Sequence, residues 1–149
     1  MKNLFLILLC ALMFSCQNDE YRSLPNTIWE KDIRFDFKKN IKDAKLIHKI
    51  IVKIKYKDQI SLQELPLEIL QRFPSGKAKI IRTLIQIQDE NGNFFGKKVE
   101  ELMEVKQDLS EQINFAENGE YTFEISHTSK EKSVPIAGIG FEIYEIKKM

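Results

Sequence analysis

Cysteine and histidine are scarce in this chain of 149 residues, which contains two of each. The sequence has no His-Glu-x-x-His segment, no paired cysteines at metal-binding spacing, no Gly-x-Ser-x-Gly and no phosphate-binding loop. We therefore expect a protein that is not an enzyme and holds no cofactor. The chain also has no marked excess of positive or negative charge, because it contains 23 basic and 22 acidic residues. Nucleic-acid binding needs a marked basic excess, so no such partner is expected.

The two histidines, His48 and His127, are the first candidates for a metal site. Each shares the parity of an apolar strand face, so the two imidazoles could meet and supply half of a zinc site. No third ligand stands out among the carboxylates. A pair of histidines at the rim of the core is therefore the favoured interpretation, and no metal is expected.

Long apolar runs are absent except at the very start of the chain. Lys2 precedes an uncharged apolar segment, Leu4 to Phe14, which is followed by Ser15 and Cys16. This segment matches the pattern of a secretory signal and is shorter than the roughly 20 apolar residues that a spanning helix needs. The sequence Met13-Phe14-Ser15-Cys16 resembles a lipobox. We therefore predict a lipoprotein signal peptide over residues 1–15 and lipidation of Cys16.

The predicted anchor has physical consequences. Acylated Cys16 would hold the protein on a membrane, because each buried methylene contributes about 0.8 kcal/mol and two or three chains bind stably. The alternative is a plain secreted protein with a free Cys16. Cys10 leaves with the signal, so the mature chain has a single cysteine and no disulfide is expected. Lys2 also leaves, and the mature chain then carries no formal net charge.

The mature chain divides into a tether and one domain. Residues 16–26 begin with a polar stretch, Gln17 to Glu20, which is typical of a lipidated tether. Residues 27–149 are enough for one compact domain, because a chain of this size buries about two-thirds of its extended surface.

Strands with alternating apolar and polar residues follow one another through most of this domain. We expect them over residues 33–37, 46–56, 65–73 and 79–87, with turns at 74–77 and at Asn91-Gly92. The strand over residues 46–56 should be central, although Ile47 and Ile51 interrupt its polar face. Residues 96–112 have partly helical spacing and predict one short helix or an irregular loop.

The last third of the chain predicts a further hairpin and a closing strand. The hairpin begins with Ile113 and Phe115, turns at Asn118-Gly119 and returns over residues 121–125, and the last strand covers 139–146. Six to eight strands joined by turns indicate an all-β fold, a single antiparallel β-sandwich or jelly-roll-like domain.

Aromatic residues are the candidates for a contact surface: Trp29, Tyr56, Phe94, Phe95 and Tyr144. Phe94 and Phe95 follow a turn, so one of the two rings should be exposed, and an exposed ring marks a contact with a partner or ligand. We take Phe94, Phe95 and Trp29 as the candidate partner contacts. The competing interpretation is that all these rings belong to the core.

Motifs spread over nearly the whole mature chain resemble the gliding-motility lipoproteins of the GldH type from gliding Bacteroidetes. The matching segments are the signal ending at Cys16, Tyr21-Arg22-Ser23-Leu24-Pro25-Asn26 with Trp29 behind it, Asp89-Glu90-Asn91-Gly92 followed by Phe94-Phe95-Gly96, Gly119-Glu120-Tyr121-Thr122-Phe123-Glu124-Ile125, and Gly138-Ile139-Gly140-Phe141-Glu142-Ile143. The resemblance implies a non-enzymatic component of the gliding apparatus that contacts other gliding or secretion proteins of the envelope.

The resemblance also implies a place in the cell, the outer membrane, on its periplasmic face or at the cell surface. The acidic residues Asp19 and Glu20 behind Cys16 resemble a surface-export signal of lipoproteins in these bacteria. The alternative function is a surface lipoprotein that binds a glycan or a peptide, and a row of exposed rings would favour it.

Overall fold

A computed structural model describes residues 21–146 and shows an antiparallel β fold throughout that range. The fold class predicted from the sequence is confirmed. The described residues form eleven strands and one 3-10 turn: β1 (Tyr21–Ser23), η1 (Pro25–Thr27), β2 (Trp29–Glu30), β3 (Phe35–Ile41), β4 (Ile47–Tyr56), β5 (Glu64–Arg72), β6 (Ala78–Gln86), β7 (Lys97–Val99), β8 (Leu102–Asp108), β9 (Gly119–His127), β10 (Ser133–Val134) and β11 (Gly138–Ile146).

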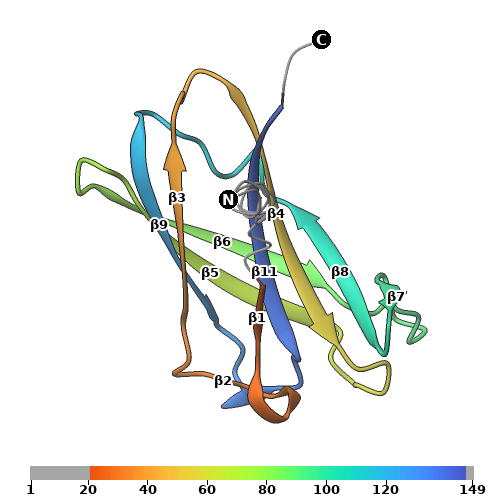
Figure 1. Cartoon of the computed structure of the whole chain (residues 1–149). Coiled ribbons are helices and arrows are strands. Elements are labelled where there is room, and N and C mark those ends of the chain that lie inside the picture. The colour runs from red at the N-terminus through yellow and green to blue at the C-terminus, as the bar shows by residue number, and fades with distance from the viewer. Residues whose placement is uncertain (1–20, 147–149) are drawn as a thin grey trace, which may run out of the picture.

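The strands form two main sheets. One has the order β1-β11-β4-β8-β7 and the other the order β3-β9-β5-β6, while β2 and β10 pair as a small separate ladder. All neighbouring strands are antiparallel. In Figure 1, β5 and β6 cross behind β4 and β11. β4 is the middle strand of its sheet, as its apolar pattern predicts.

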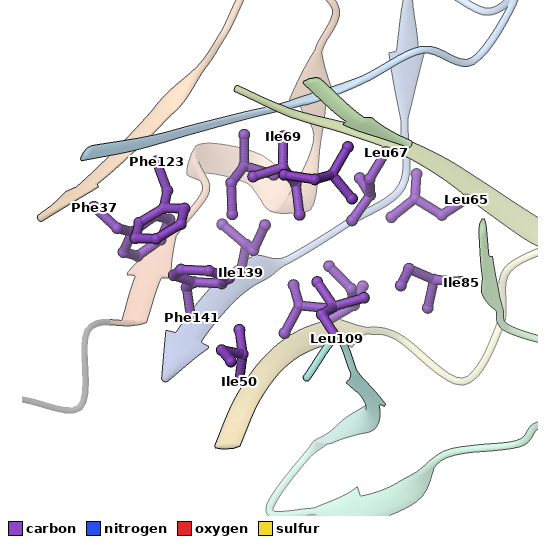
Figure 2. Close-up of a cluster of buried hydrophobic side chains, with 14 of the residues drawn as sticks. Phe37, Ile50, Leu65, Leu67, Ile69, Ile85, Leu109, Phe123, Ile139 and Phe141 are labelled. Atoms are coloured by element: carbon purple, nitrogen blue, oxygen red, sulfur yellow. The ribbon is translucent and has the colours of Figure 1, made fainter. Parts of the chain in front are cut away.

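The core lies between the two sheets and is built from inward-facing residues of both. Phe141 on β11 packs against Phe37 on β3 and Phe123 on β9, with ring centroids 5.6 Å and 4.9 Å away. Figure 2 shows Phe37 and Phe123 together on one side and Phe141 facing them. The alternation within each strand places these rings inside, since successive side chains point to opposite faces.

Polar contacts join β4 to β8 and to the loop behind it. The Lys49 ammonium pairs with the Asp108 carboxylate, which also accepts the Ser110 backbone N–H at 2.9 Å. The Ser110 hydroxyl oxygen in turn accepts the Ile50 backbone N–H at 3.0 Å. Lys49 and Ser110 lower the pKa of Asp108 to about 2, because they stabilise its ionised form.

Residues 96–112 differ from the sequence-based expectation of a helix or loop. They contain β7 and β8, a hairpin on the edge of the larger sheet. Val105 points inward, and Glu104 lies opposite Lys55 of β4 in register. Tertiary pairing with a lysine-rich neighbour therefore overrides the helical preference of the glutamate and lysine side chains.

The hairpin predicted from Ile113 and Phe115 is also wrong. Residues 113–118 form no strand, and β9 pairs instead with β3 and β5. Phe115 packs its ring 4.9 Å from that of Tyr121, and Ile113 is buried. These two apolar side chains close the core from a loop, so apolar content alone did not distinguish them from a strand.

The folded domain begins earlier than Thr27, the start expected from the sequence. Tyr21–Ser23 pairs with β11, so residues 21–26 belong to the domain and not to the tether. The Tyr21 ring lies beside Gly138 and Gly140, and the Lys55 ammonium lies 4.3 Å from its centroid. The predicted signal peptide and Cys16 lie outside the described residues.

Candidate functional site

A rigid turn after β6 carries the two candidate phenylalanines. The Asp89 carboxylate accepts the backbone N–H groups of Asn91 and Asn93, each at 2.8 Å, and the Asn93 side-chain amide at 3.0 Å. These bonds lower the pKa of Asp89, the amide of Asn93 contributing most. The Asn91-Gly92 pair sits at the tip, where Gly92 takes a φ of 80°. The turn is therefore fixed by its own hydrogen bonds.

Phe94 and Phe95 point in opposite directions from this turn. Phe94 packs against the core, with its ring 5.5 Å from that of Tyr56 at the end of β4. Phe95 is 57% exposed, and its backbone N–H donates to the Ile87 carbonyl at 3.0 Å. The inward ring anchors the segment, and the outward ring is presented to solvent.

Gly96 fixes how closely this segment approaches the sheet. A Cβ at Gly96 would lie 2.7 Å from the Glu104 carbonyl oxygen and 2.8 Å from the Tyr56 hydroxyl. Only glycine allows this approach, because real Cβ atoms do not come so close to backbone oxygens. Gly96, the residue after Phe95, therefore lies directly against β8. Val99 of the same hairpin is a further exposed apolar residue.

A hollow of about 570 Å³ lies beside this hairpin, between the turn that joins β7 to β8 and the loop after β4. Its lining is mainly charged: Lys55, Lys57, Asp58, Gln59, Val99, Glu100, Glu101 and Leu102. Glu100 adopts a positive φ of 57°, which is uncommon outside glycine. The exposed Phe95 and this hollow lie at the same end of the larger sheet, and we call them together the distal surface.

Trp29 does not belong to any exposed surface. Its side chain has no exposed area, its indole N–H donates to the Ile33 carbonyl at 2.9 Å, and its ring packs edge-on against Phe35 and His127. The expectation that Trp29 contacts a partner is therefore wrong. The single tryptophan is large enough to close one end of the core, and this buried position explains why a tryptophan stands there.

The two histidines lie at opposite ends of the sandwich. His48, near the start of β4, packs 4.9 Å from Phe115, which in turn contacts Tyr121 at the start of β9. His127 is the last residue of β9 and packs on Trp29. Within residues 21–146, no three histidine, cysteine or acidic side chains are grouped so that they could hold a metal ion.

His127 has an altered affinity for protons. Burial lowers the pKa of His127, because desolvation disfavours the charged imidazolium, and the backbone of Trp29 acts in the opposite direction. Its ring is packed in the core, and the residue is only 2% exposed. We assign His127 a structural role in the core.

Exposed rings do not form a row in the part of the chain that the structure describes. Tyr144 is 50% exposed at the far end of β11, while Tyr56 is fully buried. Phe95 and Tyr144 therefore belong to different ends of the sheet. The feature that would favour glycan binding is not found among residues 21–146.

Sequence reasoning missed one apolar surface. Ile47 and Ile146 are paired in register on β4 and β11, and both are largely exposed, as are Leu46 and Tyr144 beside them. The signal was present in the sequence, because Ile47 interrupts the otherwise lysine-rich face of its strand.

Comparisons with known proteins show the family to which this chain belongs. The model of the GldH lipoprotein family matches residues 17–143. The chain belongs to the GldH lipoprotein family. It is similar to the gliding motility lipoprotein GldH of Flavobacterium johnsoniae, with 26% identity over 155 residues that cover 95% of this chain and 96% of that protein. No solved structure matches it.

Family membership confirms the resemblance drawn from the sequence motifs and makes this chain a lipoprotein of a family involved in gliding motility. The GldH-type motifs fall on defined parts of the fold. The Tyr21 segment is β1, the Asp89–Gly96 segment presents Phe95, and the two glycine-led segments are β9 and β11.

Among residues 21–146, no helix is long and apolar enough to cross a membrane.

Proposed function

We propose that this GldH-family lipoprotein is anchored to the outer membrane by acyl chains on Cys16. It works by contact with other envelope proteins of the gliding apparatus, in association with the secretion of motility adhesins. It performs no catalysis in this role. The family of the chain is shown, and the proposal adds its location in the cell and its mode of action.

The observation that carries the contact mode is the exposed Phe95 ring on its rigid turn. A large aromatic side chain that is 57% exposed leaves much apolar area in water. The Asp89 hydrogen bonds, the Phe94 anchor and the close approach at Gly96 hold the backbone that carries this ring. Little backbone freedom is lost when a partner covers a ring on a segment that is already held, and aromatic anchors often dominate interfaces.

A photoreactive phenylalanine analogue tests the contact directly in living cells. Placed at Phe95, it should crosslink the protein to a partner and yield a heavier species that carries this chain. The matched control is the same analogue at Leu84, an exposed apolar position on the outer face of β6. Equal or absent crosslinking at the two positions contradicts a contact at Phe95.

Radiolabelled palmitate tests the anchor. Wild-type protein should take up the label, whereas Cys16→Ala should take up none and accumulate as uncleaved precursor, since the signal peptidase of lipoproteins cuts only after the thioether has formed. Wild-type protein that carries no label and is released into the medium with a free Cys16 overturns the lipid anchor.

A deletion strain tests the physiological role. Loss of the gene should abolish spreading on agar and reduce the amount of adhesin at the cell surface, and both should return with the wild-type gene on a plasmid. Normal spreading of the deletion strain overturns the proposed role in gliding.

A further inference from the structure

The end of the larger sheet opposite the distal surface carries an apolar patch. Ile47, Tyr144 and Ile146 lie on its outer face, 49%, 50% and 40% exposed, and Leu46 lies next to them where the chain enters β4. Ile47 and Ile146 are directly paired, and Tyr144 is paired with Lys49. We call these four apolar residues the proximal patch.

The register of β1 places the start of the described chain on the side of this patch. Tyr21 pairs with Gly140 and Ser23 with Gly138, so the first residue of β1 is the one nearest to Tyr144 and Ile146 along β11. Figure 1 shows β1 antiparallel to β11, with the C-terminal end of β11 beyond the start of β1. The point where the chain enters the domain therefore faces the patch.

The predicted tether is too short to hold this end away from a bilayer. Only four residues, Gln17 to Glu20, separate Cys16 from Tyr21. Five extended residue steps span at most about 17 Å. The distance along β11 from Gly140 to Ile146 is about 20 Å, from six residue steps. An acyl-bearing Cys16 therefore keeps the proximal patch close to the membrane surface.

Charge around the patch suits a layer of lipid phosphates. Lys39, Lys42 and Lys45 are exposed at this end, and none of them takes part in an ion pair with another residue of 21–146. Three acidic groups are close. The Asp43 carboxylate accepts the Lys45 backbone N–H at 3.0 Å, and the Glu145 carboxylate lies 4.0 Å from the His48 ring nitrogen Nε2. The third, Asp108, is paired with the ammonium of Lys49, the register partner of Tyr144.

A hollow of about 320 Å³ opens beside the patch, between the ends of β3 and β11. Lys39, Lys42, His48 and Tyr144 are among its lining residues. Aliphatic side chains, a tyrosine and lysines together are the set that settles at the boundary between headgroups and acyl chains, where each side chain keeps its apolar part in lipid and its polar end in water.

We propose that the proximal patch docks directly on the membrane that holds the anchor, so that this lipoprotein lies against the bilayer by one end of its sheet. The proposal rests on the lipid anchor at Cys16. It commits to a phospholipid surface as the occupant, because the anchor brings that surface to the patch and the unpaired lysines match its phosphates. The distal surface would then point away from the bilayer.

Tryptophan reporters in the full-length acylated protein test this docking. Tyr144→Trp is reconstituted in vesicles of phosphatidylethanolamine and phosphatidylglycerol whose acyl chains carry bromine near the headgroup. Its emission should fall by about half or more, because a docked ring lies at the boundary between headgroup and acyl chain. Leu46→Trp is a second reporter on the neighbouring loop and should respond in the same way. The wild type, with only the buried Trp29, supplies the background.

Phe95→Trp is the matched control at the opposite end of the sheet and should keep its emission. Equal quenching at Tyr144→Trp and Phe95→Trp, or none at either, in protein that is acylated and bound to the vesicles overturns the docking alone. Protein that carries no acyl chain by mass spectrometry and stays in the supernatant overturns the anchor instead. A photoreactive analogue at Tyr144 that crosslinks in cells to a protein and not to phospholipid also overturns the docking.

Discussion

At the scale of single residues, the hydroxyl group of Tyr121 holds a loop that closes one end of the core. Tyr121 is fully buried near the start of β9, and its hydroxyl donates to the Glu117 carbonyl at 2.9 Å and accepts the Glu117 backbone N–H at 3.1 Å. The same arrangement, a tyrosine bonded to backbone a few residues upstream, pins loops in other sandwiches. Here it holds the loop that brings Phe115 over the core.

Tyr121→Phe should lower the free energy of unfolding by about 1–3 kcal/mol, because two backbone groups lose their buried partner while the ring packing is kept. Urea unfolding measures the change. Tyr144→Phe, at a half-exposed tyrosine, is the control and should leave stability within about 0.5 kcal/mol of the wild type. Equal free energies of unfolding for the two variants would contradict a stabilising role of the Tyr121 hydroxyl.

His127 should make the domain less stable in mild acid. Burial lowers its pKa in the folded protein, so the unfolded chain takes up a proton more readily as the pH falls below about 6.5. The stability is complete above that pH and is lost as the pH falls through the lowered pKa. Lys31 adds to the shift, and Glu30 opposes it.

His127→Phe removes the titrating group and keeps a ring against Trp29. The loss in melting temperature between about pH 8 and about pH 5 should therefore be smaller in His127→Phe than in the wild type. An equal loss in the two proteins would show that His127 does not carry this acid sensitivity.

At the scale of elements, β1 depends on a single neighbouring strand, β11. It is three residues long, lies at the edge of its sheet, and is held by Tyr21 beside the glycines of β11. A Cβ at Gly138 would meet the Tyr21 ring and lie 2.8 Å from the Arg22 carbonyl oxygen, whereas a Cβ at Gly140 has no contact closer than 3.4 Å.

Gly138→Ala should therefore detach β1 and cost about 1–3 kcal/mol, the usual range for overpacking, while Gly140→Ala should be nearly neutral. Hydrogen exchange of the β1 amides measures this, with faster exchange expected only in Gly138→Ala. Unchanged exchange in Gly138→Ala would mean that β1 does not depend on the close approach.

The elements that could be predicted from the sequence are those whose own pattern decides their structure. β4 alternates over ten residues, and β5 and β6 are joined by the turn at Pro74 to Lys77. β8 was missed because its pairing depends on β4: Glu104 faces Lys55, and Asp108 pairs with Lys49, a complementarity that exists only between strands.

The candidate site could be predicted only in part, for the same reason. The Asn91-Gly92 turn is local, so a solvent-facing ring at Phe94 or Phe95 followed from the sequence. Burial of Trp29 depends on His127 and Phe35, which are distant from each other in the sequence. The exposed pair Ile47 and Ile146 comes from opposite ends of the domain and needed the register.

At the scale of the whole molecule, the larger sheet separates two surfaces. β4 runs from Ile47 in the proximal patch to Tyr56 beneath Phe94, and nine residue steps give about 30 Å between them. With the proximal patch docked, one end of the sheet lies at the membrane and the other presents Phe95 to a partner. A short tether and a rigid sandwich together set the height at which that partner is met.

The most direct test is the spreading of cells whose only copy carries Phe95→Asp. Spreading should be impaired at wild-type protein abundance, because a carboxylate on the distal surface would have to be buried in the contact. Leu84→Asp, at a comparably exposed position on the other sheet, should spread normally. Wild-type spreading of Phe95→Asp cells at normal abundance would contradict the claim that this lipoprotein works through contact at Phe95.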